Sequence, residues 1–187
     1  MLSLYITNLK IYKMENQNTA KKIMLTYGLY IGILSIIVNL VNYSFGNLFE
    51  PHWGVMVVGM LIFIGFVVYG IKVFKDLNNG FLKLGQAIKL GLGIALVAAI
   101  VGIVYQFLLM YVIEPDYLTK MAEFQEQAMY EKFPDMPEEQ LEQAIQMSKK
   151  FSGPGILVVM SLAFNLFFGL IVSLIAGAIM KKEEQYA

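Results

Sequence analysis

Four long windows of the sequence, 23–45, 53–71, 90–113 and 155–180, contain no Asp, Glu, Lys, Arg or His. An α-helix rises about 1.5 Å per residue, so about 20 apolar residues cross the ~30 Å hydrocarbon layer of a membrane. The windows lack the alternating pattern of membrane β-strands. The sequence therefore predicts an all-α fold, an integral membrane four-helix bundle that occupies residues 23–180.

The overall composition agrees with membrane spans and argues against a soluble enzyme. Hydrophobic residues make up 58 % of the chain and charged residues 15 %, against about 45–50 % and about 25 % in soluble domains. The first window is too long for the apolar part of a cleaved signal peptide and lacks a small-residue cleavage site, so we expect it to stay as an anchor.

Residues 1–22 form an N-terminal segment before the first span, and residues 181–187 form a short tail; both are expected in the cytoplasm. The first 13 residues add no span, whereas Met14 opens a hydrophilic run. We therefore expect Met14 to be the natural start and the stretch before it to be mobile.

Lysine placement predicts the orientation of the spans. Of 14 lysines, ten lie before the first span, between the second and third, or after the fourth. The segment 114–154 carries nine acids and four lysines. Because cytoplasmic loops are enriched in lysine and arginine, both termini are expected in the cytoplasm and the acidic segment outside.

The acidic outer segment shows helical periodicity in two stretches. Tyr117, Met121, Phe124 and Ala128 recur at helical steps, and the pattern resumes after Glu138. Between them lies a break with two prolines, where Asp135 and Glu138 fit an N-cap pair. We predict a helical hairpin between the third and fourth spans; a solvated linker with transient helicity is the alternative.

The lysine-rich loop between the second and third spans allows two interpretations. After the break at Asn78, Asn79 and Gly80, apolar residues follow at helical spacing as far as Ile88. They form either a short helix on the membrane surface or an extension of the third span with its lysines reaching the interface.

Small residues four positions apart form ridges that let helix backbones approach closely. The ridges are Gly28 and Gly32 in the first span, Gly91, Ala95 and Ala99 in the third, and Gly169, Ser173 and Gly177 in the fourth. Packing within the bundle is one explanation of these ridges, and self-association of two copies is the other.

Amide side chains are the main polar groups inside the windows. They are Asn39 and Asn42 in the first span, Gln106 in the third and Asn165 in the fourth. Such amides commonly form hydrogen bonds between helices, and the alternative is that they line a ligand path. The absence of ionisable residues from the windows argues against a proton-coupled carrier.

No arrangement of residues indicates a catalytic, metal or cofactor site. The chain has no cysteine, and its single histidine, His52, stands in the outer turn without a cluster of other ligands. We expect no enzymatic activity, no cofactor and no bound metal. The zero net charge gives no sign of a nucleic-acid partner.

Three local motifs resemble a known family. They are the run from Asn79 to Ala87, the glycine-rich third span that follows it, and the exit from Ile113 to Tyr117 into a long polar helical loop. Together they resemble the bacterial membrane family called domain of unknown function 4199, over roughly residues 18–182. The resemblance implies a four-helix protein of the bacterial inner membrane and brings no assigned activity.

Two functions are compatible with these features. The first is a non-enzymatic structural or interaction protein whose outer hairpin contacts a second copy or another membrane protein. The alternative is a small transporter or channel component that works as an oligomer. In both, the lipid bilayer surrounds the spans.

Overall fold

The computed structural model describes residues 2–45, 49 and 52–183, of which residues 2–17 are described as backbone only. This part is helical and contains no strand, which confirms the all-α class. The elements are α1 (Leu2–Ser44), α2 (Trp53–Leu77), α3 (Leu84–Leu108), the π-helical turn η1 (Leu109–Ile113), α4 (Tyr117–Lys132), α5 (Glu138–Phe151) and α6 (Pro154–Met180). Four stretches are long and apolar enough to cross a membrane: Asn18–Ser44, Trp53–Leu77, Leu84–Ile113 and Pro154–Met180.

The helix α1 is continuous from Leu2, so the stretch before Met14 is helical. No glycine or proline interrupts the sequence between Leu2 and Tyr27, and a helix that is already nucleated extends at low cost. The short connection between the first two windows contains Gly46, Asn47 and Pro51, which are typical turn residues, and Glu50; these four residues lie outside the described part of the chain.

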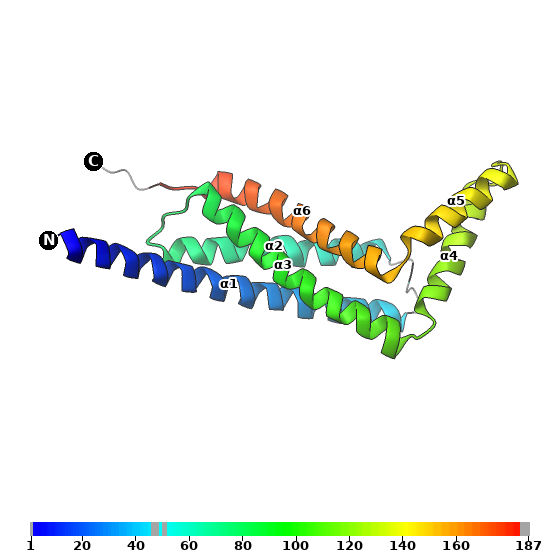
Figure 1. Cartoon of the computed structure of the whole chain (residues 1–187), viewed down its shortest axis with the longest axis horizontal. Helices are drawn as coiled ribbons and strands as arrows, with labels where there is room; N and C mark the ends of the chain where they lie inside the picture. The colour runs from blue at the N-terminus through cyan, green and yellow to red at the C-terminus, as the bar shows by residue number, and fades with distance from the viewer. Residues whose placement is uncertain (1, 46–48, 50–51, 184–187) are drawn as a thin grey trace.

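Figure 1 shows how the helices are arranged. The first turns of α1, the α2–α3 connection and the end of α6 lie at one end of the molecule, and α4 and α5 project from the other end. The first of these ends carries Lys72, Lys75, Lys83, Lys181 and Lys182, and we call it the lysine-rich end.

The helix α3 lies at the centre of the packing, in contact with α1, α2 and α6. Its face toward α6 includes Ala87, Gly91 and Ala95, which are buried. Ala99, the last residue of the predicted ridge, is buried too. A methyl group added at Gly91 would overlap the side chain of Ser173, and one added at Gly169 would lie 2.6 Å from the Cβ of Ala95. The ridges of the third and fourth spans thus face each other within one chain.

The helix α1 packs against another side of α3 through its own ridge, Gly28 and Gly32. A methyl group on Gly28 would lie 2.5 Å from the Cβ of Val97, and one on Gly32 would lie 2.6 Å from the Cβ of Val101. Both glycines therefore let the backbone of α1 approach β-branched side chains of α3 closely, since a larger residue would meet them.

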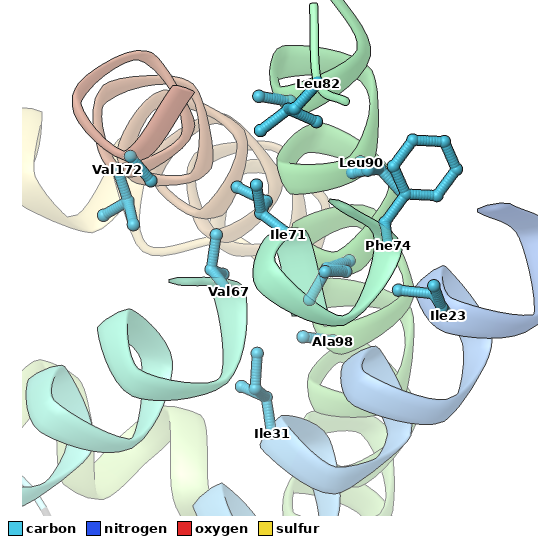
Figure 2. Packing of buried hydrophobic residues seen from close by; sticks show 12 residues of the cluster. Ile23, Ile31, Val67, Ile71, Phe74, Leu82, Leu90, Ala98 and Val172 are labelled. Atoms are coloured by element: carbon cyan, nitrogen blue, oxygen red, sulfur yellow. The ribbon is translucent and has the colours of Figure 1, made fainter. Parts of the chain in front are cut away.

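The helix α2 completes the core near the lysine-rich end. Val67, Ile71 and Phe74 of α2 are buried, and Figure 2 shows Ile71 and Val67 pointing into the space shared with α3 and α6. The buried residues of α6 lie between Gly169 and Gly177, also in the half nearer that end. The opposite halves of α2 and α6 are mostly exposed, so the apolar core is concentrated toward the lysine-rich end.

The connection between α2 and α3 is a tight turn. Asn79 and Gly80 have φ angles of 54° and 79°, a left-handed conformation that glycine and asparagine tolerate best. Leu84 then opens α3 directly, so the extension of the third span is correct and no separate surface helix forms there. Leu82 and Lys182 exchange two backbone hydrogen bonds of 2.9 Å, which tie this turn to the end of α6.

Because α3 and α6 pack closely, larger side chains at Gly169 and Gly177 of α6 should destabilise the fold. We expect Gly169→Ile and Gly177→Ile each to lower the free energy of unfolding by about 1–3 kcal/mol, because the added atoms overlap α3. Thermal unfolding of the purified protein in detergent measures the change.

Ala178→Ile is the matched control, because Ala178 lies on the exposed side of α6. It introduces the same side chain one residue from Gly177, on the side of α6 that is exposed. If Gly169→Ile and Gly177→Ile unfold at the temperature of this control, the packing described for α6 is wrong.

Candidate functional site

The chain leaves α3 through an irregular elbow at residues 109–117. The N–H of Glu114 donates to the carbonyl of Leu109 at 2.8 Å, which widens the last turn into the π-helix η1. Pro115 disfavours helical geometry at the residue before it, and Glu114 accordingly has φ −135° and ψ 82°. The α-helix therefore ends here, and the chain turns into α4.

The carboxylate of Glu114 ties three elements together at this elbow. It accepts a hydrogen bond of 2.8 Å from the ammonium of Lys120 in α4 and one of 3.2 Å from the hydroxyl of Tyr43 in α1. The bond from Lys120 is the main cause that lowers the pKa of Glu114, and the bond from Tyr43 lowers it further. The same bond raises the pKa of Lys120. Charge and hydrogen bonding thus fix how α4 leaves the long helices.

Aromatic side chains support the elbow from the side of the α1–α2 connection. The ring of Phe49 lies 5.2 Å from that of Tyr117 and 5.8 Å from that of Phe124, measured between centroids. Burial raises the pKa of Tyr117, and the nearby Tyr105 adds to this effect. Aromatic pairs at such separations stabilise by about 0.5–1.5 kcal/mol beyond their burial.

The helices α4 and α5 form the predicted hairpin, which we call the arm (residues 117–151). A short apolar contact holds them together, with Met121, Leu141 and Ile145 buried. Beside it, the hydroxyl of Ser148 donates to Oε1 of Gln125 at 2.8 Å, and the hydroxyl of Ser152 lies 2.9 Å from the same oxygen. The ammonium of Lys149 pairs with Glu126 at 2.8 Å. The arm therefore has a defined structure, and the alternative of a solvated linker is not what the structure shows.

The start of α5 differs from the prediction. Pro137, with φ −55°, is the N-cap residue, and α5 begins at Glu138, so Asp135 does not cap the helix. The fixed φ of proline suits the residue before a first helical turn. Glu138 and Glu139 in the first turn and Lys149 and Lys150 in the last turn complement the helix dipole.

The outer surfaces of the arm combine carboxylates with large apolar side chains. Tyr130, Phe133, Met147 and Phe151 are all at least 48 % exposed. Among them stand the exposed acids Glu123, Glu131, Asp135, Glu138, Glu139 and Glu142. Exposed aromatic and methionine side chains are enriched in protein interfaces, so this surface is suited to contact with another protein.

The four amides inside the long helices do not share one cavity. Asn39 and Asn165 donate to the carbonyls of Ser35 and Ser161, one turn earlier on their own helices, at 2.9 Å each. Asn42 is buried near the end of α1, and Gln106 is half-buried on α3. Asn165 lines an apolar groove between α2 and α6 to which the other three amides do not contribute.

His52 has a structural role at the start of α2. Its Nδ1 accepts a hydrogen bond of 3.2 Å from the N–H of Gly54 and so caps the helix. Within the described residues, no group of three or more His, Asp or Glu side chains is placed to hold a metal ion.

Two close contacts between helices carry no obvious signal in the sequence. A methyl group on Gly70 of α2 would lie 2.7 Å from Cδ1 of Ile94, and one on Gly93 of α3 would overlap Met24. Neither glycine belongs to a pair of small residues four positions apart on the contacting face, so the ridge pattern did not identify them. The bond between Tyr43 and Glu114 joins residues 71 positions apart and has no local signature either.

The elbow predicts a measurable titration. The pKa of Glu114 is lowered, so its bonds to Lys120 and Tyr43 favour the folded elbow above the ordinary value of 4.5 and are lost as the pH falls through the lowered pKa. We expect Lys120→Met to return the pKa of Glu114 toward 4.5, because the largest cause of the shift is removed. A ¹³C NMR titration of labelled glutamate carboxyls measures it.

Lys149→Met is the control for this experiment, because Lys149 pairs with Glu126 and not with Glu114. It should leave the titration of Glu114 unchanged. A Glu114 that titrates at its ordinary value in the unaltered protein would contradict the elbow geometry.

Comparison with known proteins places the chain in one family. The family described as "Protein of unknown function (DUF4199)" matches residues 26–182, which include the C-terminal part of α1, the whole of α2, α3 and α6, and the arm. No curated protein and no solved structure matches the chain. The chain belongs to the DUF4199 family, as its sequence motifs predict.

Proposed function

We propose that this chain is a multi-pass protein of the bacterial inner membrane that acts without catalysis, through contact of its arm with a second copy or another membrane protein. The observation that carries this proposal is the arm itself: a stiff hairpin, anchored at the elbow, that projects from the long helices and exposes Phe133 and Met147 among carboxylates. Both termini lie in the cytoplasm and the arm lies outside.

The surface of the long helices supports the location in a membrane. Met56, Leu61, Ile100, Val104 and Phe167 are each more than half exposed. Soluble monomers rarely expose contiguous apolar surface of this kind, whereas lipid covers it at no cost.

Two observations favour contact over transport. The windows 23–45, 53–71, 90–113 and 155–180 contain no Asp, Glu, Lys, Arg or His on which an ion or proton path could depend. Asn39 and Asn165 bond to carbonyls of their own helices. By contrast, the arm combines a defined backbone with exposed aromatic side chains, which are features of a contact surface.

Site-specific photo-crosslinking in native membranes tests the role of the arm. A photoreactive phenylalanine analogue at position 133 or 147 should give one discrete protein adduct, because a specific partner places the same surface against the arm. The same probe at Ile100, exposed on α3, serves as the control and should react only with lipid. Adducts of twice the mass of the chain identify a second copy.

The crosslinking result has a clear contrary outcome. If positions 133 and 147 behave like position 100, with no discrete protein adduct in membranes that contain the protein at its natural level, the arm is not a contact surface and the proposed function fails.

Reporter fusions test the orientation. A phosphatase that is active only outside the cytoplasm should be active when inserted within residues 123–142 and inactive when fused after Lys182, because ten of the 14 lysines lie on the side of the termini. Phosphatase activity at the fusion after Lys182 would overturn this topology.

A further inference from the structure

An apolar groove of about 620 Å³ runs along the outside of α2 and α6. Its walls include Met60, Ile64 and Val68 of α2 and Phe168, Ile175 and Ile179 of α6. Asn165 is the polar residue among its lining side chains, and the amide nitrogen of Asn165 already bonds to Ser161. A volume of this size is typical of small-molecule sites in proteins.

The groove is long and reaches one end of the long helices. Along α6 it extends from Phe164 to Met180, which is about 24 Å at the rise of an α-helix. It thus ends where α6 ends, at the lysine-rich end of the molecule. Its length exceeds one leaflet, which is about half of the ~30 Å hydrocarbon layer.

Both walls of the groove continue into lysines at this end. On α2, Lys72 stands four residues beyond Val68 toward the lysine-rich end, so these two side chains are neighbours on the helix surface. On the other wall, Lys181 directly follows Met180. Lys72 and Lys181 are both exposed, and the acids closest to them in sequence, Asp76 and Glu183, are exposed too.

We propose that this groove binds one acyl chain of an anionic phospholipid in the leaflet at the lysine-rich end, with the lipid phosphate held by Lys72 and Lys181. The apolar walls match the acyl chain, and the two ammonium groups match the negative head group. Basic pockets between helices at a membrane surface recognise such head groups.

The shape of the walls favours a lipid chain over a helix of a second copy. Helices in membranes associate through small residues that let their backbones approach. In α6 the small residues Gly169 and Gly177 face α3, and the groove is lined by bulky side chains such as Phe168 and Ile175. An α-helix with its side chains is about 10–12 Å wide, whereas an acyl chain is a single file of methylene groups.

This inference rests on the proposed membrane location and is independent of the arm. If the crosslinking experiment on the arm fails, the proposal of a lipid site is unaffected. If the lipid site is disproved, the proposed role of the arm is unaffected.

Native mass spectrometry of the full chain from detergent tests the site, with phosphatidylglycerol and phosphatidylcholine of identical acyl chains as probes. We expect one tightly retained phosphatidylglycerol per chain and weaker retention of phosphatidylcholine. Lys72→Gln and Lys181→Gln should each weaken phosphatidylglycerol binding about fivefold, the usual contribution of one lysine at a charged membrane surface. Lys22→Gln, on α1, is the charge control and should change nothing.

A second pair of variants tests the groove itself. Ile175→Trp places a large ring in the groove and should abolish retention of both lipids. Leu174→Trp adds the same ring one residue away, outside the groove lining. Both positions are exposed, so both variants should fold, which thermal unfolding verifies.

Three results would overturn the proposal. One is equal retention of the two lipids by the unaltered protein. The second is retention by Ile175→Trp equal to that by Leu174→Trp. The third is a dimer of the unaltered protein that Ile175→Trp separates, because the groove would then hold a second copy.

Discussion

The approach of α3 to α6 depends on the absence of side-chain atoms at a few positions. Gly91 meets Ser173 and Gly169 meets Ala95 at distances that leave no room for a methyl group. Inside lipid, no hydrophobic effect draws two apolar helices together, so dispersion contacts between closely spaced backbones must supply the attraction. Because α3 also receives α1 and α2, the arrangement of the long helices rests on this one helix.

The two ends of the molecule use different interactions. Toward the lysine-rich end, the long helices are held by apolar packing around Ile71 and by the backbone bonds between Leu82 and Lys182. At the other end, side-chain hydrogen bonds add to the packing. The carboxylate of Glu114 accepts from Tyr43 and Lys120, and the amide oxygen of Gln125 accepts from Ser148 and Ser152. The anchor of the arm at Glu114 therefore responds to pH, whereas the apolar core of the long helices contains no such titrating contact among its buried residues.

The sequence predicted the elements of this structure better than their junctions. Uninterrupted apolar windows are a strong signal for long helices, and the four-residue spacing of Gly91, Ala95 and Ala99 identified the buried face of α3 correctly. The stretch from Glu138 to Phe151 was predicted as helical, but its N-cap was assigned wrongly to Asp135, because Pro137 occupies the capping position. Local patterns contain no information about partners far along the chain, and for this reason the bond between Tyr43 and Glu114 and the contact of Gly70 with Ile94 could not be predicted.

The candidate site shows the same limit. The acidic hairpin could be predicted from two amphipathic stretches of the sequence. Its internal hydrogen bonds to Gln125 and its attachment through Glu114 became apparent only in the structure. The groove between α2 and α6 was not visible, because its lining residues are ordinary apolar side chains whose spacing on each helix resembles that of any lipid-facing surface.

The order of the helices along the chain has a consequence for biosynthesis. The partner of the small-residue face of α3 is α6, and the whole arm is synthesised between them. At roughly 5–20 residues per second, the ribosome needs a few seconds for this interval. During that time the Gly91–Ala95–Ala99 face has only lipid or α1 and α2 beside it. The arm must therefore be synthesised in full before α6 can close onto α3.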